Sequence, residues 1–142
     1  MLIILLDQAT KWLALRFLHL GDTLPVIPDV FHLTLIRNTG IAFGLFQNSE
    51  GLLMILITLS LIVLAVWGYR LHQTSTMVRL GFVLILGGAV GNWVDRFRFG
   101  AVIDFIDFRF WPVFNIADSA ITAGVFCFLI LFLKRPKEHK ES

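Results

Sequence analysis

The sequence GGAVGNWVDRFRFGAVIDFIDFRFWPVFNIAD, residues 87–118, decides how the chain folds, because it places acidic and amide side chains between two apolar segments. Uncharged runs of 15 residues precede Asp95 and follow Asp118. At about 1.5 Å per residue each run rises about 22 Å, which is less than a hydrocarbon core of about 30 Å. If both runs cross a membrane, their acidic ends lie at or slightly below its surface, on one shared side. Ionisable groups at that depth usually face an interior site, so the stretch predicts an active site at a membrane surface.

The composition is that of a chain built for lipid. Of the 142 residues, 57% are hydrophobic and 15% are charged, whereas soluble domains have about 45–50% and about 25%. We therefore expect a single integral-membrane domain over residues 1–142. The net charge of +2 indicates membrane topology rather than nucleic-acid binding. Cys127 lies in an apolar run and is expected to be a packed thiol, and the scattered histidines predict no metal site and no cofactor.

The apolar runs predict an α-helical membrane protein with four transmembrane helices, at about residues 1–20, 52–69, 79–97 and 115–134. Residues 21–51 differ, because Pro25 and Pro28 break any helix and residues 30–37 are rich in branched and aromatic side chains. We expect this block to form a small sheet and loop on the membrane, between the first two helices. The distribution of Lys and Arg leaves the orientation open.

The first apolar run carries charges of its own. Asp7 and Lys11 are four residues apart, so on a helix they share a face and can neutralise each other. The run lacks the positive start and small-residue cleavage site of a signal peptide. We expect it to form the first transmembrane helix, with its polar side turned inward.

Asp118 is the strongest catalytic candidate, because it is inserted between Ala117 and Ser119 within an apolar run. The simpler alternative is a carboxylate at a helix start, where Asn115 is the cap and the helix dipole favours negative charge. Asp104 has a comparable alternative as an ordinary loop acid. Both alternatives remain open from the spacing alone.

The other polar residues of the stretch have more structural interpretations. Asp107 is a rival acid that we expect to face solvent, and Asp95, next to Arg96, is expected to be a structural ion pair or a positioning group. Asn92 and Asn115 could orient carboxylates or substrate. The small residues Gly87, Gly88 and Gly91 are expected to let helices pack closely.

Two carboxylates without a nucleophile–base pair suit one type of chemistry. Two acids that lie close together cannot both ionise freely, so one keeps a proton. The ionised acid can then deprotonate a water while the protonated acid polarises a peptide carbonyl, as in an aspartic peptidase. Two alternatives remain: a transporter or proton relay through Asp7, Lys11, Asp95 and Asp118, and a non-catalytic membrane assembly factor.

Five motifs in order resemble those of the lipoprotein signal peptidase family, also called signal peptidase II. They are Asp7-x-x-Thr10-Lys11, Asn38-x-Gly40-x-Ala42-Phe43, Gly91-Asn92-x-x-Asp95-Arg96, Val102-x-Asp104-Phe105 and Phe114-Asn115-x-Ala117-Asp118. Each motif alone is weak. Together, on a four-span profile of this length, they are specific, and the resemblance covers nearly the whole chain.

The resemblance implies a multi-pass aspartic endopeptidase of the bacterial cytoplasmic (inner) membrane. Such an enzyme cleaves prolipoproteins just before a cysteine that carries diacylglycerol, and globomycin-type cyclic peptides inhibit it. By motif, the catalytic pair is Asp104 and Asp118, on the extracytoplasmic side. From its mix of polar and aromatic residues, we expect the β-rich block of residues 21–51 to clamp the substrate. The other site positions are Asp7, Lys11, Asn38, Gly40, Asn92, Asp95, Arg96, Asn115 and Ala117. We expect a monomer whose partners are the substrate and membrane lipid, with no nucleic acid and no metal.

Overall fold

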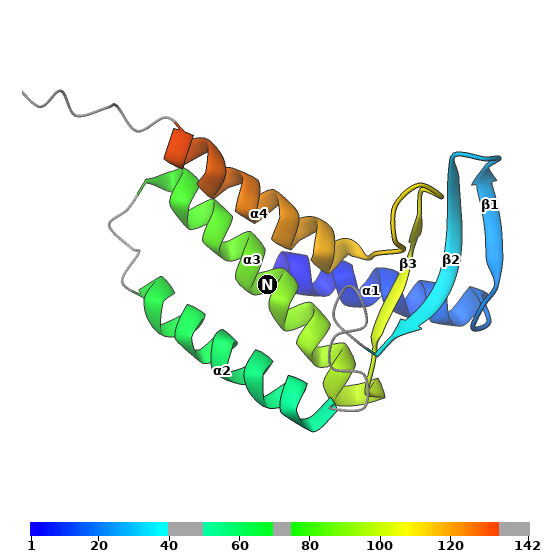
Figure 1. The fold of residues 1–142 in the computed structure, drawn as a ribbon, viewed down its shortest axis with the longest axis horizontal. Helices are drawn as coiled ribbons and strands as arrows, with labels where there is room; N and C mark the ends of the chain where they lie inside the picture. Colours follow the sequence, from blue (N-terminus) through cyan, green and yellow to red (C-terminus); the bar gives the residue numbers. More distant parts are fainter. Residues whose placement is uncertain (40–49, 70–74, 134–142) are drawn as a thin grey trace, which may run out of the picture.

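The computed structural model contains four helices and a three-stranded sheet, and it describes residues 1–39, 50–69 and 75–133 (Figure 1). The helices are α1 (Leu2–Phe17), α2 (Glu50–Tyr69), α3 (Thr76–Phe99) and α4 (Ile116–Leu133). The strands are β1 (Thr23–Ile27), β2 (Phe31–Asn38) and β3 (Val102–Asp107). Each helix coincides, within a few residues, with one of the four apolar runs.

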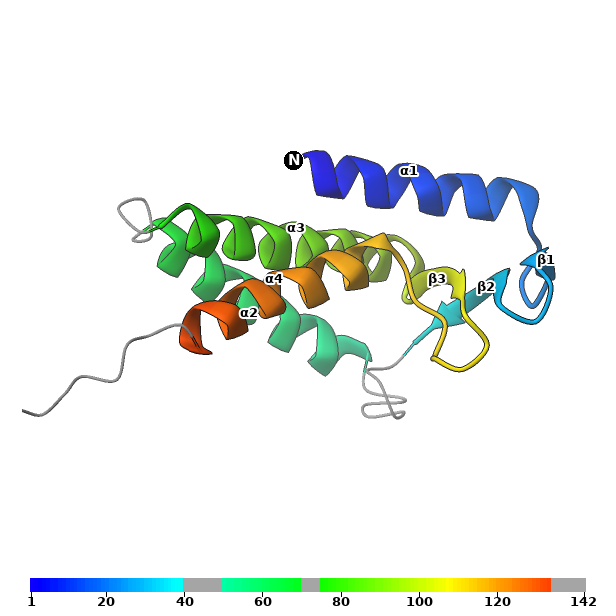
Figure 2. The ribbon, with the colours of Figure 1, turned by 90° about the horizontal axis from the view of Figure 1, so that it is seen from above.

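Helix α3 is the centre of the helical part and contacts the three other helices. Figure 1 shows α3 between α2 and α4, and Figure 2 shows α1 on a separate layer beside them. Within the described residues, α3 and α4 are long and apolar enough to cross a membrane, while the apolar part of α2, Met54–Gly68, is shorter. Large apolar side chains such as Ile62 in α2 and Phe132 in α4 are exposed on the outer faces. An apolar outer surface of this kind suits lipid rather than water.

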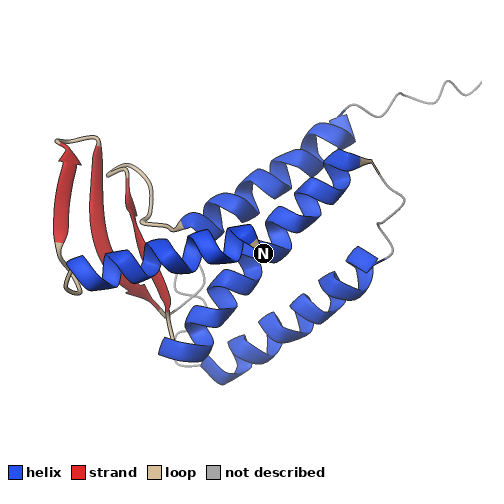
Figure 3. Ribbon diagram, turned by 180° about the vertical axis from the view of Figure 1, so that it is seen from behind, coloured by secondary structure: helices blue, strands red, loops and turns tan. Residues whose placement is uncertain are grey.

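The sheet lies at one end of the helices and has the antiparallel order β1-β2-β3 (Figure 3). The first two strands confirm the small sheet that was expected within residues 21–51. The third strand, β3, follows α3 and was not predicted. Leu35 of β2 and Ile103 and Phe105 of β3 pack with Ala14 of α1 to form the core cluster of the described residues. The sheet is therefore attached to the helices on the side of α1.

The reversal from α3 into β3 brings the polar residues of the central stretch together. Helix α3 ends at Phe99 and is capped by Gly100, which has the left-handed φ of 69° that glycine adopts without strain. The carboxylate of Asp95, one turn before the end of α3, accepts a hydrogen bond from the backbone N–H of Ile103 at 3.1 Å. This bond fixes the first part of β3 against the last turns of α3.

Glycines of α3 let α1 and α4 approach closely, as expected. A Cβ at Gly88 would meet the carbonyl oxygen of Ala117 in α4, and a Cβ at Gly91 would lie 2.6 Å from Oδ2 of Asp7 in α1. The polar groups of α1 and α4 can reach α3 only because these positions carry no side chain.

Substitution of Gly88 by alanine is therefore expected to destabilise the protein by about 1–3 kcal/mol, because the added methyl group forces α3 and α4 apart. The matched control is Gly51→Ala in α2, where an added Cβ meets nothing within 4 Å. This control is expected to be neutral or stabilising by up to about 1 kcal/mol. Unfolding of both variants in detergent checks the prediction, and equal stability of the two would contradict it.

Candidate active site

Asp104 and Asp118 reach the site from different elements. Asp104 lies in the middle of β3 and is 1% exposed, and Asp118 is the third residue of α4. The backbone N–H of Asp118 donates to Oδ1 of Asn115 at 2.9 Å, and the N–H of Asn115 donates to Oδ2 of Asp118 at 3.2 Å. This reciprocal pair is a capping box, so Asp118 does lie at a helix start, which by itself neither assigns nor excludes a catalytic role. The capping box uses only Oδ2 of the Asp118 carboxylate.

Two asparagine side chains connect the two acids. Nδ2 of Asn92 in α3 donates to Oδ1 of Asp118 at 2.7 Å. Nδ2 of Asn115 donates to Oδ1 of Asp104 at 2.6 Å and to Oδ1 of Asn92 at 3.1 Å. The second oxygen of Asp104 accepts from Nδ2 of Asn38, the last residue of β2, at 3.1 Å. The acids therefore belong to one hydrogen-bonded cluster, in which each asparagine donates to one of the two carboxylates.

Burial, and after it the negative charge of Asp118, raise the pKa of Asp104 to about 7. Hydrogen bonds from Asn38 and Asn115 oppose these two effects without cancelling them. A carboxyl group with a pKa near 7 can hold or release a proton at neutral pH. This is the property that a general acid or base requires.

A buried ion cluster lies directly behind the asparagines. Nζ of Lys11 lies 2.8 Å from Asp7, 2.7 Å from Asp95 and 2.9 Å from Oδ1 of Asn92, so each of its three N–H groups has an acceptor. The other oxygen of Asp7 accepts from the backbone N–H of Ala117 at 2.9 Å. The expected Asp7–Lys11 pair is confirmed. Asp95 also forms a structural ion pair, and its partner is Lys11. The cluster fastens α1 to α3 and to the start of α4.

Gln8 belongs to the same cluster and was missed in the sequence. Its Nε2 donates to Oδ1 of Asp95 at 2.8 Å and to the carbonyl oxygen of Gly91 at 3.2 Å. A polar amide inside an otherwise apolar run, next to Asp7, was the signal that could have identified it.

The remaining predicted positions have different outcomes. Arg96 lies one turn after Asn92 and its guanidinium donates to the Asn92 carbonyl oxygen at 3.4 Å. Gly40 lies outside the described residues. The expectation that Asp107 faces solvent is wrong: the residue is 4% exposed, because its carboxylate accepts from the hydroxyl of Thr34 and from Arg109.

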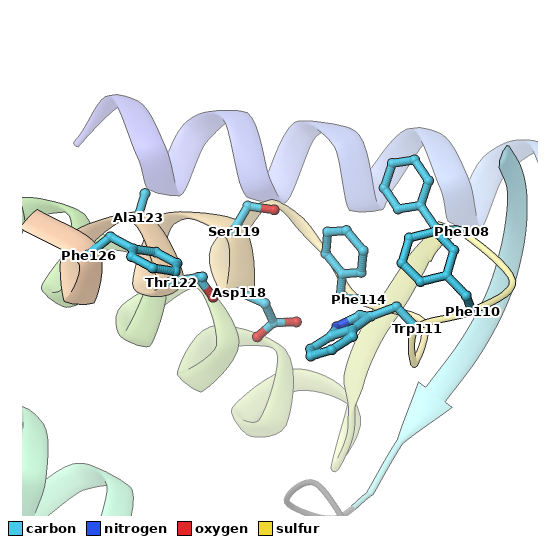
Figure 4. Close-up of a pocket in the computed structure, with 9 residues that line it drawn as sticks. All are labelled: Phe108, Phe110, Trp111, Phe114, Asp118, Ser119, Thr122, Ala123 and Phe126. Carbon is cyan, nitrogen blue, oxygen red and sulfur yellow. The ribbon is translucent and has the colours of Figure 1, made fainter. Parts of the chain in front are cut away.

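A pocket of about 470 Å³ lies next to Asp118, between α4 and the segment that follows β3. Figure 4 shows the carboxylate of Asp118 between the first turns of α4 and the side chain of Trp111. The pocket is lined by Phe108, Phe110, Trp111, Phe114, Asp118, Ser119, Thr122, Ala123 and Phe126. One acid of the cluster therefore faces a mainly apolar space that can receive part of a ligand.

These features define a helical protein with apolar outer faces and two linked carboxylates, one buried and one half-buried, where the helices meet the sheet. Comparison with known proteins agrees with that class. Residues 1–134 match the family model described as signal peptidase (SPase) II. The chain belongs to the signal peptidase II family.

Relatives and solved structures support the assignment. The lipoprotein signal peptidase of Halothermothrix orenii is 43% identical over 133 residues, which cover 94% of this chain and 90% of the relative. That of Trichormus variabilis is 45% identical over 142 residues, covering 96% and 88%. A bacterial membrane enzyme solved by the in meso method at 2.3 Å resolution has a TM-score of 0.86 and 32% identity, covering 99% of this chain and 88% of that one. The chain is therefore a peptidase and a membrane-embedded protein, which confirms the resemblance seen in its motifs.

Proposed function

We propose that Asp104 and Asp118 are the catalytic pair of an aspartic endopeptidase that removes the signal peptide from diacylglyceryl-modified prolipoproteins, cutting just before the lipidated cysteine. Membership of the signal peptidase II family supports the substrate class. The observation that carries the catalytic assignment is the hydrogen-bonded linkage of the two carboxylates through Asn92 and Asn115.

In this mechanism the pair shares one proton. Asp104, with its pKa near 7, holds the proton at and below neutral pH and donates a hydrogen bond to the carbonyl of the scissile peptide. Asp118 lies in the first turn of α4, where the helix dipole favours negative charge, and it accepts a proton from the attacking water. As the tetrahedral intermediate collapses, the leaving amine takes a proton from the pair, so the roles of the acids exchange.

The remaining site residues act by holding the pair. Asn38, Asn92 and Asn115 donate hydrogen bonds to the two carboxylates. The ion cluster of Asp7, Lys11 and Asp95 orients Asn92 from behind, because Lys11 occupies the oxygen of that amide. The family's positions Gly40, Arg96 and Ala117 complete the set that shapes the site or binds substrate.

The proposed setting is the bacterial cytoplasmic (inner) membrane, with all four helices spanning it as one domain and the acids on the extracytoplasmic side. Asp104 lies on the sheet and Asp118 at the start of α4, so both belong to the end of the helices where the sheet is attached (Figures 1 and 3). A scissile bond next to a lipid anchor arrives at the membrane surface, where this end of the molecule would meet it. We further propose a monomer that globomycin-type peptides inhibit and whose residues 21–51 clamp the substrate.

The cluster argues against a proton relay through Asp7, Lys11, Asp95 and Asp118. All three N–H groups of Lys11 are engaged by acceptors at 2.7–2.9 Å, and the residue is 2% exposed. An ammonium group whose N–H donors all have acceptors suits a structural role better than repeated proton transfer.

The pH dependence of cleavage tests this proposal. The raised pKa of Asp104 means that the pair keeps its shared proton below about pH 7 and loses it above. We expect kcat/KM for a diacylglyceryl-modified prolipoprotein to fall as pH rises through about 7, approaching a tenfold loss per pH unit. The measurement is signal-peptide release in detergent from pH 5 to 9, with thermal unfolding recorded at each pH as the control. No cleavage at any pH would contradict the proposed function, and constant kcat/KM up to pH 9 would contradict the shared proton.

A further inference from the structure

The segment between β3 and α4 is held by a buried carboxylate that the proposed mechanism does not use. We call residues 108–113 the aromatic loop, because it carries Phe108, Phe110 and Trp111. Asp107, the last residue of β3, uses both carboxylate oxygens there. Oδ1 accepts from the backbone N–H of Arg109 at 2.8 Å, and Oδ2 accepts from the Arg109 guanidinium at 3.1 Å and from the Thr34 hydroxyl at 2.7 Å.

These contacts hold the loop in a conformation that it would not adopt by itself. Arg109 has a φ of 66°, in the left-handed region that non-glycine residues rarely occupy. The Asp107 carboxylate binds both the backbone and the side chain of Arg109 in this conformation. Two backbone hydrogen bonds between Ile106 and Phe114, at 2.8 and 3.0 Å, close the base of the loop, and within it the backbone N–H of Phe110 donates to the carbonyl oxygen of Phe108 at 2.8 Å. Asp107 adds the contacts that hold both the backbone and the side chain of Arg109.

The conformation matters because the aromatic loop is one wall of the pocket at Asp118. The ring of Phe108 lies 5.9 Å from that of Phe114 and 6.2 Å from that of Phe110. Phe110 and Trp111 are 83% and 62% exposed, so packing does not bury them in the core. Figure 4 shows these rings on one side of the pocket and α4, with Asp118, on the other.

We propose that Asp107 is a positioning residue that sets substrate specificity, by holding the aromatic loop as an apolar wall next to Asp118. The part of the substrate that this wall recognises is an extended apolar chain beside the scissile bond. Such a chain can come from an acyl group of the lipidated cysteine or from an apolar side chain of the signal peptide. This inference rests on the proposed function, since it assigns the pocket to the substrate of the same site.

The test separates substrate binding from chemistry in Asp107→Ala. We expect KM for the lipidated prolipoprotein to rise about tenfold, which corresponds to ~1.4 kcal/mol, while kcat stays within about twofold of wild type. The control is Arg79→Ala, because Arg79 is an exposed charged residue in the first turn of α3, at the opposite end of that helix from β3. The control is expected to keep the wild-type KM.

One further variant keeps the inference testable if Asp107→Ala does not fold, and a second tests the role of the Arg109 conformation if it does. Thr34→Val removes one donor to Asp107 and is expected to raise KM about threefold, in the same direction. Adding Arg109→Gly to Asp107→Ala is expected to recover part of the lost affinity, since glycine adopts the left-handed conformation without help.

Two substrate series identify the source of the apolar chain. One has shortened acyl groups on the cysteine, and the other has alanine in place of the apolar residues before the cleavage site. In the supporting outcome, wild type discriminates within one series and Asp107→Ala loses that discrimination. If wild type cleaves but neither KM nor discrimination changes in the variants, the inference is wrong and the proposed function stands. A fall in kcat at constant KM would also overturn it, whereas a wild type that never cleaves would overturn the proposed function itself.

Discussion

Asp104→Asn and Asp118→Asn are each expected to lower kcat for signal-peptide release by at least about 10³-fold. Asparagine keeps the shape of the side chain and can still hydrogen bond to Asn92 or Asn115. It cannot accept a proton from water or share one with a second acid. The measurement is cleavage of a diacylglyceryl-modified prolipoprotein at saturating concentration by purified protein in detergent.

The control for these variants is Arg79→Gln, which removes an exposed charge from the first turn of α3, at the opposite end of that helix from β3. It is expected to cleave at the wild-type rate. Thermal unfolding establishes that each variant is folded. If Asp104→Asn or Asp118→Asn folds and cleaves at a rate near that of wild type, that residue is not catalytic.

Lys11→Met is expected to have the largest effect on stability, a loss of about 3–5 kcal/mol. The substitution leaves Asp7 and Asp95, which are 0% and 1% exposed, without the ammonium that compensates their charges. It also removes the donor to Asn92. The measurement is the free energy of unfolding of the purified variant in mixed micelles.

Arg16→Met is the matched control, because Arg16 is an exposed cation in the last turn of the same helix. Its guanidinium lies 5.3 Å from the ring centre of Trp12, an interaction worth about 0.5–1 kcal/mol at an exposed site. If Lys11→Met costs no more than Arg16→Met, the buried cluster does not hold α1 against α3 and α4.

The helices could be predicted from the sequence because hydropathy reports lipid exposure directly. The helix expected at residues 52–69 is observed at Glu50–Tyr69, and the helix expected at residues 79–97 is observed at Thr76–Phe99. Helix α3 continues through Asp95 and Arg96 because Asp95 is buried against Lys11 and does not end the helix. The ion pair of Asp7 and Lys11 followed from helical spacing alone.

The third strand and the burial of Asp107 could not be predicted, because they depend on contacts far apart in the sequence. β3 forms only by pairing with β2, and Asp107 is buried partly by Thr34, 73 residues earlier. The linkage of Asp104 to Asp118 has the same origin, since it passes through Asn92 and Asn115 on separate elements. The spacing of the acids in the sequence left several of them as candidates for the catalytic pair. Only the resemblance of the motifs to the family selected Asp104 and Asp118.

The most direct test of the central claim, that Asp104 and Asp118 act as one pair, is a double-mutant cycle on kcat. The four proteins are wild type, Asp104→Asn, Asp118→Asn and the double variant, all assayed on the same lipidated prolipoprotein. Residues that share one proton act as a unit, so the double variant is predicted to cleave no more slowly than either single variant. Losses that multiply in the double variant would show that the two acids act independently, which would contradict the pair.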